Sequence, residues 1–311
     1  MSHLPLNYRY IAGFLYIGLA AITFPIYAII VKIFLTHKTF SSNISYVILA
    51  VLGIFDCFML IGFAGCGVFT IYDNTFNWIF EKAFLSMMNA SRNATFPTIL
   101  LIAFNRFVVL TKFVLLPPDF YKFTLIGLFA YWLTFTILCM TTLAGQKYFL
   151  DFALGAYDYS LKWSPYIGSL EYHINIACLG VALGLYLITV VVLIYRRNQM
   201  FFTDRNVLQL PEIRVLAMAM VIFLVYSLDV LVTYFGPQFI AINQMVAIML
   251  MVALECTCGL LNPLLFLIMN SSSPKAGLAL RSSLRASTQT RLPCILCRRR
   301  RFTDRKCMIF R

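Results

Sequence analysis

The sequence predicts an all-α integral membrane protein, a bundle of seven transmembrane helices. Of its 311 residues, 61% are hydrophobic and only 12% are charged, whereas soluble domains carry about 25% charged residues. Seven apolar stretches are long enough to cross the roughly 30 Å hydrocarbon core of a bilayer as helices. These stretches are continuous rather than alternating, which favours helices over the strands of a membrane barrel.

The seven spans follow one another along the chain with mostly short connections. We expect them at residues 11–34, 46–71, 78–110, 123–143, 174–195, 215–235 and 240–269. The first span has full length and follows ten polar-to-mixed residues, which is unlike a cleavable signal peptide. The expected organisation is a short extracellular N-terminus (1–10), the seven-helix bundle (11–269) and a cytosolic basic tail (270–311).

Basic residues predict the orientation of the bundle. Twenty of the 25 lysines and arginines lie in alternate loops and in the tail, four lie on the opposite side, and Arg92 lies inside the third span. Basic loops remain in the cytosol, so the N-terminus is expected outside. This asymmetry accounts for most of the net charge of +13, and we therefore expect an anionic inner leaflet, not nucleic acid, as the partner of the basic side.

The tail has two features typical of membrane attachment. Residues 274–285 place alanine and leucine on one face beside arginines, which predicts a short amphipathic helix on the inner leaflet. Cys294 and Cys297 stand next to four consecutive arginines and are candidates for S-palmitoylation. A zinc site is not expected because no second cysteine pair follows at suitable spacing. The motifs of nucleotide-dependent, zinc-dependent and serine-dependent enzymes are absent from the sequence, so we expect no enzyme.

A single arginine stands at the cytosolic end of the third span, in the sequence Asn105-Arg106-Phe107. A guanidinium stays charged at physiological pH and is costly near hydrocarbon, although we expect water at that face to relieve part of the cost. Arg106 could lock to a neighbouring helix and later release to a cytosolic protein. It could equally be a basic anchor that reaches the lipid headgroups.

The seventh span carries Asn262-Pro263-x-x-Phe266 near its cytosolic end. Proline removes a backbone donor and kinks a helix, and asparagine can bond the carbonyl that the proline frees. The motif predicts either a moving segment or a kink that only shapes the bundle.

Asp56 lies midway along the second span. A carboxylate at this depth costs free energy, and this makes Asp56 a candidate functional residue. With Thr95 and Asn262 it could form a central polar cluster that holds water or a sodium ion. Alternatively, it is a single hydrogen-bonded acid, even a protonated one.

The outer halves of several spans predict a ligand cavity. Arg92 is expected to pair with Asp229 or Glu255, and we favour a cavity over a purely structural ion pair because further polar residues cluster at the same depth. The loop 144–172, rich in aromatic residues, would cover the entrance. None of the nine cysteines falls in an expected extracellular loop, so no disulfide framework is predicted there. The expected lining residues are Asn89, Arg92, Asn93, Ser227, Asp229, Tyr234 and Glu255.

Taken together, these motifs resemble those of rhodopsin-like G-protein-coupled receptors. In that family Arg106 would be the arginine of the Asp/Glu-Arg-Tyr motif, and Asn262, Pro263 and Phe266 would match Asn-Pro-x-x-Tyr. Asp56 and Thr95 would match the sodium site.

The chain also departs from that family. The acid before the arginine is replaced by Asn105, no cysteine occurs near Glu81, and the span 215–235 contains neither tryptophan nor proline. The departures are similar to nematode serpentine chemoreceptors of class T or class X, which share Asn-Arg-Phe, the Leu52-Gly-Ile-Phe-Asp56 sequence and Phe24-Pro25-Ile-Tyr27.

This resemblance implies a chemosensory receptor in the plasma membrane of sensory-neuron cilia. It would bind an external small molecule and signal through a heterotrimeric G protein. Three alternatives remain: a seven-helix ligand-gated channel, a small membrane transporter, and a receptor-derived chain that no longer signals. The transporter would use Asp56, Arg92, Asp229 and Glu255 as a relay.

Overall fold

The computed structural model describes residues 5–111, 117–199 and 210–240. The chain divides into two units, Met1–Met269 and Asn270–Arg311, and the second unit lies wholly outside the described residues. So do nearly all of the expected seventh span (241–269), the predicted amphipathic helix, and the two candidate lipidation sites Cys294 and Cys297.

Six described helices are long and apolar enough to cross a membrane. This confirms the predicted helical membrane bundle for the first six spans. A one-turn helix, α2 (Lys38–Ser41), lies between the first two. The six are α1 (Leu6–Thr36), α3 (Ile44–Tyr72), α4 (Trp78–Thr111), α5 (Pro118–Met140), α6 (Ser164–Gln199) and α7 (Leu210–Ile240).

Five of these six helices begin earlier than the sequence predicted, and α4 begins at the expected residue. The helix α6 begins at Ser164, ten residues before the expected start of the fifth span, and α5 begins at Pro118 instead of residue 123. Both starts contain a proline in the first turn, where its fixed φ suits a helix and its missing N–H leaves no bond unmade. The first turns of α6 therefore belong to a segment that the sequence analysis assigned to a loop.

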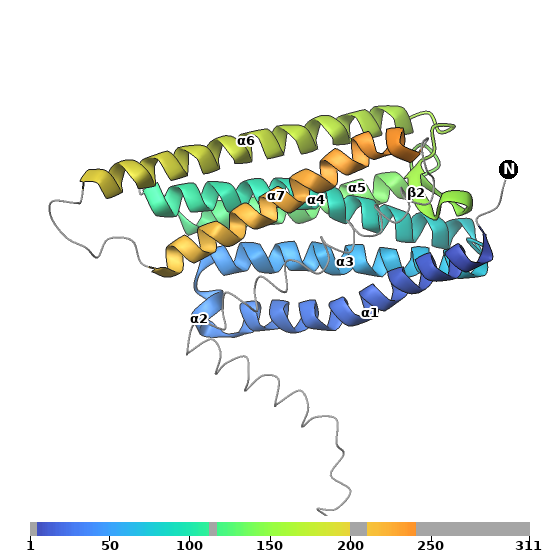
Figure 1. The fold of residues 1–311 in the computed structure, drawn as a ribbon, viewed down its shortest axis with the longest axis horizontal. Coiled ribbons are helices and arrows are strands. Elements are labelled where there is room, and N and C mark those ends of the chain that lie inside the picture. Colours follow the sequence, from blue (N-terminus) through green and yellow to red (C-terminus); the bar gives the residue numbers. More distant parts are fainter. Residues whose placement is uncertain (1–4, 112–116, 200–209, 241–311) are drawn as a thin grey trace, which may run out of the picture. The chain divides into compact units, whose positions relative to one another are not determined.

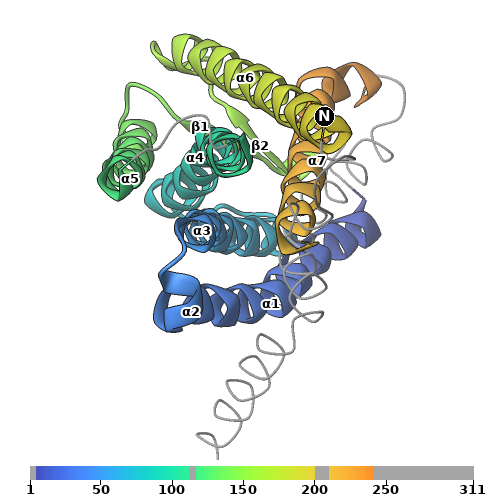
Figure 2. The ribbon, with the colours of Figure 1, turned by 90° about the vertical axis from the view of Figure 1, so that its left-hand side faces the viewer.

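The helix α4 occupies the centre of the bundle. It contacts α3, α5, α6 and α7, while α1 packs along α3, and the end-on view shows α4 between α3, α5 and α6 (Figures 1 and 2). In the most apolar stretch of each span, 67% of residues are buried in α3 and α4, against 22% in α5 and α6. The third span is thus surrounded by protein rather than by lipid, which suits its polar sequence.

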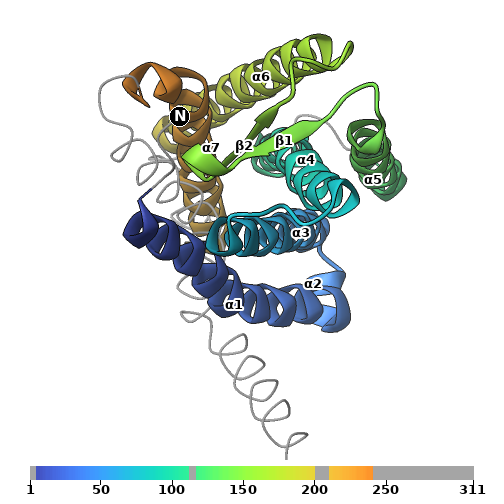
Figure 3. The same ribbon diagram turned by 90° about the vertical axis from the view of Figure 1, so that its right-hand side faces the viewer.

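The loop after α5 folds into a β-hairpin that the sequence analysis did not predict. Strands β1 (Gln146–Phe149) and β2 (Leu154–Tyr157) are antiparallel, with Gln146 opposite Tyr157, and the 3-10 turn Leu150–Phe152 joins them. We call residues 146–157 the outer hairpin. It lies across one end of the bundle, beside α4 and α6 (Figure 3), and the first turns of α1 lie at the same end (Figure 1).

Hydrogen bonds to three helices hold the outer hairpin in place. The Tyr148 backbone N–H donates to Glu81 Oε1 of α4 at 2.7 Å, and the Tyr148 hydroxyl lies 2.6 Å from Thr70 Oγ1 of α3. The Tyr16 hydroxyl of α1 donates to the Ala153 carbonyl at 3.3 Å. Gly155 permits close approach to α4, because a Cβ there would lie 2.7 Å from Leu85.

Two glycines allow a close approach of helices α1 and α3. A Cβ on Gly13 would contact the Ile71 side chain and lie 2.9 Å from the Gly67 carbonyl oxygen, while a Cβ on Gly67 would lie 2.8 Å from the Gly13 oxygen. Small residues let helix backbones meet in membranes, where van der Waals packing drives association.

We predict that Gly13→Ala destabilises the protein, because its Cβ overlaps a backbone atom that cannot rotate away. The free energy of unfolding should fall by about 1–3 kcal/mol. The matched control is Gly18→Ala on the same helix, where a Cβ meets nothing within 4 Å and helix propensity favours alanine by up to about 1 kcal/mol. Thermal unfolding in detergent measures both variants, and equal midpoints would contradict the close contact.

Candidate functional site

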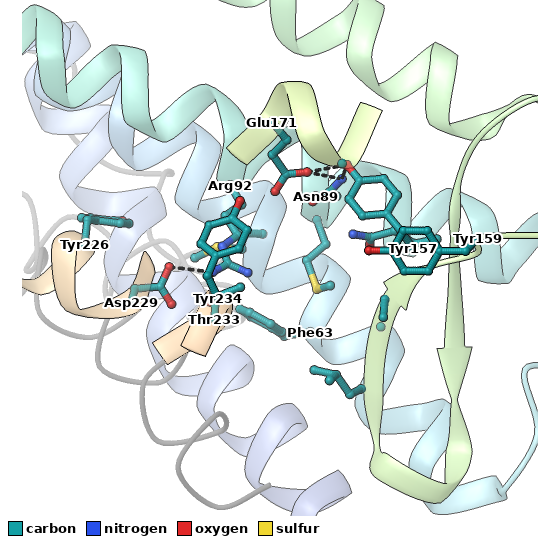
Figure 4. Close-up of a pocket in the computed structure, with 17 residues that line it drawn as sticks. Phe63, Asn89, Arg92, Tyr157, Tyr159, Glu171, Tyr226, Asp229, Thr233 and Tyr234 are labelled. Carbon is teal, nitrogen blue, oxygen red and sulfur yellow. Dashed lines mark hydrogen bonds and ion pairs between the residues drawn. The ribbon is translucent and has the colours of Figure 1, made fainter. Parts of the chain in front are cut away.

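A cavity of about 360 Å³ lies at the outer-hairpin end of the bundle. Side chains of α3, α4, α6 and α7 line it together with β2, so it is bounded by helices that are far apart in sequence (Figure 4). Its apolar wall includes Met59, Phe63 and Met88. Two separate polar groups face the space.

The first polar group is an ion pair between the third and sixth spans. The Arg92 guanidinium donates to Asp229 Oδ2 at 2.9 Å and also to the Thr233 hydroxyl. The two charged side chains are 22% and 8% exposed. Of the two partners that the sequence offered for Arg92, the structure brings Asp229 to it, and Glu255 lies outside the described residues.

The second polar group joins α4, α6 and the outer hairpin. The Asn89 amide donates to the Tyr157 hydroxyl at 2.8 Å and lies 3.5 Å from Glu171 Oε2. The Tyr157 hydroxyl donates to the same carboxylate oxygen. Removal from water, followed by the negative charge of Glu171, raises the pKa of Tyr157, so the phenol remains a donor at physiological pH.

The structure places four of the predicted cavity residues on its wall, namely Asn89, Arg92, Asp229 and Tyr234. Two others point elsewhere: Asn93 Oδ1 accepts from Asn175 at 3.2 Å, and the Ser227 hydroxyl donates to the Phe223 carbonyl.

The cavity wall also contains Glu171, Tyr157 and Thr233, which were not predicted from the sequence. Glu171 was assigned to a loop because the start of α6 was placed too late. Its spacing of four from the buried Ile167 and Asn175 is the signal that would have placed it on the inner face of a helix.

Asp56 is fully buried at the centre of the bundle, and two phenols hold it. Tyr27 of α1 donates to Oδ2 at 2.7 Å and Tyr226 of α7 donates to Oδ1 at 2.9 Å. The predicted neighbour Thr95 donates to the Ser91 carbonyl of its own helix instead, and Asn262 lies outside the described residues. Both carboxylate oxygens already accept hydrogen bonds, and the sodium ion at Asp56 stays a prediction.

At the opposite end of α4, Arg106 is 5% exposed. The expectation that water relieves its charge is wrong, because protein encloses the residue. Its neighbour Asn105 is buried and donates to Ser45 Oγ of α3 at 2.8 Å, while Phe107 is half-buried. The other residues predicted for this end, Asn262, Pro263 and Phe266, lie outside the described residues.

Among solved structures, the fold is similar to the crystal structure of squid rhodopsin. The superposition has a TM-score of 0.75 and covers 93% of this chain and 89% of that chain, at 13% sequence identity. No family model matches the sequence, and no curated protein matches it significantly. The likeness therefore shows a rhodopsin-like fold.

We predict that Asp229→Asn destabilises the protein by about 1–3 kcal/mol, because the variant takes a charged acceptor away from the partly buried Arg92. The matched control is Asp119→Asn, which removes the ion pair between Asp119 and Lys122. Both side chains of this pair are 68–69% exposed, and exposed ion pairs contribute little to the free energy of unfolding. Thermal unfolding of both variants tests the difference. Equal losses would show that the buried pair contributes no more than the surface pair.

Proposed function

We propose that this protein is a G-protein-coupled chemosensory receptor for an external small molecule. The observation that carries the proposal is the polar cavity at the outer-hairpin end, where the Arg92–Asp229 pair joins the third and sixth spans of a rhodopsin-like bundle. A small molecule that enters this cavity meets groups that hold two helices together. Its binding can therefore change how those helices pack.

The described contacts suggest how such a change would travel. The helix α7 is bound to α4 through Asp229 at the cavity and to α3 through Tyr226 and Asp56 one turn further in. A ligand that binds one arrangement of α7 better than another shifts the equilibrium between them. At the inner end of α4, the buried Arg106 would then become accessible to a cytosolic heterotrimeric G protein.

The chemosensory class rests on the sequence. Asn105-Arg106-Phe107 and Leu52-Gly-Ile-Phe-Asp56 resemble nematode serpentine chemoreceptors of class T or class X. Asn105 donates to Ser45 of α3, so a neutral contact between helices stands at the position where the Asp/Glu-Arg-Tyr motif of rhodopsin-like receptors has its acid. On this basis we place the receptor in the plasma membrane of sensory-neuron cilia.

We predict that Arg106→Ala leaves expression at the cell surface intact and abolishes ligand-evoked signalling. The reason is that the variant loses the one enclosed cation expected to contact the G protein. A small-molecule panel with a G-protein readout measures this. Lys122→Ala is the control, since it removes an exposed cation that is expected on the same side. Normal signalling by the Arg106 variant would refute the role.

We also predict that an epitope tag at residue 1 is accessible on intact cells and that a tag at residue 311 is not, because of the distribution of basic residues. Antibody staining before and after permeabilisation measures both. A cytosolic N-terminus would support a seven-helix channel of the insect odorant-receptor type instead. Ligand uptake into vesicles that lack any G protein would support a transporter.

A further inference from the structure

Glu171 brings a negative charge to the cavity wall. The residue is 7% exposed and comes from α6, on the side of the cavity that faces the outer hairpin. Its hydrogen bonds go to two neutral groups, Tyr157 and Asn89. Among the residues that the structure describes, no cation lies within ion-pairing distance of this carboxylate.

Hydrogen-bond donors surround the Glu171 carboxylate. An amide nitrogen can only donate, so Asn89 directs its hydrogens towards the Tyr157 oxygen and Glu171 Oε2. The Tyr157 hydroxyl accepts from Asn89 and gives its own hydrogen to Glu171. Two donors therefore converge on the carboxylate oxygen Oε2, and both come from neutral side chains.

Other described charges near the cavity are already engaged. The Arg92 guanidinium is bound to Asp229 and Thr233. The Lys82 ammonium donates to the Thr141 carbonyl and to the Ala144 carbonyl, and Lys82 is not part of the cavity wall. Glu171 thus leaves one negative charge that the described part of the wall does not balance.

Aromatic rings surround the same space. Tyr157, Tyr159, Tyr226 and Tyr234 all line the cavity (Figure 4). The face of an aromatic ring attracts a cation electrostatically, most strongly where water is excluded. A carboxylate among tyrosine rings therefore matches a positively charged nitrogen better than it matches a neutral or acidic group.

We propose that the cavity binds a small organic amine, with the protonated nitrogen on Glu171 and the apolar part of the molecule against Met59, Phe63 and Met88. The inference rests on the proposed function, because it assumes that this cavity is the ligand site. The volume of about 360 Å³ lies near the lower end of the range for ligand pockets, about 300–1,000 Å³, and so suits a small molecule. An ammonium would complete the partners of Glu171 without breaking the Arg92–Asp229 pair.

The test uses matched triplets of probes on the purified full-length protein. 2-Phenylethylamine, 2-phenylethanol and phenylacetic acid share one frame, and butylamine, 1-butanol and butyric acid share another. Binding is measured as the concentration-dependent rise in the thermal unfolding midpoint, since a ligand that binds the folded state stabilises it. We expect stabilisation by at least one amine, and none by its matched alcohol or acid.

Variants assign the effect to Glu171. Glu171→Gln should weaken amine binding about 10- to 100-fold, the range for losing a hydrogen bond to a charged group. Glu171→Asp should retain most of it. The matched control is Asp158→Asn, which removes a negative charge next to the outer hairpin but outside the cavity wall and should leave binding unchanged. The contrast between amine and alcohol on the unmodified protein needs no variant, so the test holds even if the glutamine variant does not fold.

Three results would overturn the inference: no amine stabilises the protein, the alcohols or acids match the amines, or the glutamine variant binds amines as well as the native protein does. Failure of the proposed function looks different. Amine binding without any G-protein response would retain the amine site and refute the receptor. Arg106-dependent signalling evoked only by neutral compounds would retain the receptor and refute the amine site.

Discussion

The bundle depends on the polar side chains of α4 finding partners on other elements. A polar group in hydrocarbon has no water to bond, so each one that the third span carries needs a protein partner. Successive residues of α4 bond to different neighbours, which explains why this helix lies at the centre. The partners are Tyr148 of β1 for Glu81, Tyr157 of β2 for Asn89, Trp132 of α5 for Ser91, Asp229 of α7 for Arg92, Asn175 of α6 for Asn93 and Ser45 of α3 for Asn105.

Because α4 is bonded to α3, α5, α6 and α7, it limits how α7 can move. The helix α7 is bound through Asp229 to α4 and through Tyr226 to Asp56 of α3. The Tyr226–Asp56 contact is buried and the Arg92–Asp229 contact is partly buried. A shift of α7 must therefore exchange one polar partner for another, because losing a bond without replacement would cost the desolvation free energy of the group. The available arrangements are therefore few and discrete, which is what the proposed two-state mechanism requires.

The sequence predicted the parts of this structure that depend on composition and on single residues. Long apolar runs located six described spans, and the rarity of charge in the outer half pointed to Arg92 and Asp229. Features that depend on chain geometry could not be predicted in the same way. The start of α6 at Ser164 was not predicted because its first turns contain polar and aromatic residues. For this reason Glu171 was not predicted to line the cavity. The partners of Asp56 were missed because Tyr27 and Tyr226 lie 29 and 170 residues away along the chain.

The outer hairpin shows how a loop that contains no cysteine can still be held in place against the wall of a cavity. Rhodopsin-like receptors have a cysteine near the position of Glu81. In this protein the Glu81 carboxylate accepts a hydrogen bond from the Tyr148 backbone N–H instead. The contacts of Tyr148 with Glu81 and Thr70 position β1, and the pairing of Gln146 with Tyr157 relates that position to β2. A slip of one residue would turn Tyr157 to the other face of the strand. The Asn89–Tyr157–Glu171 group would then come apart, so the register of a four-residue strand determines whether the cavity presents an oriented carboxylate.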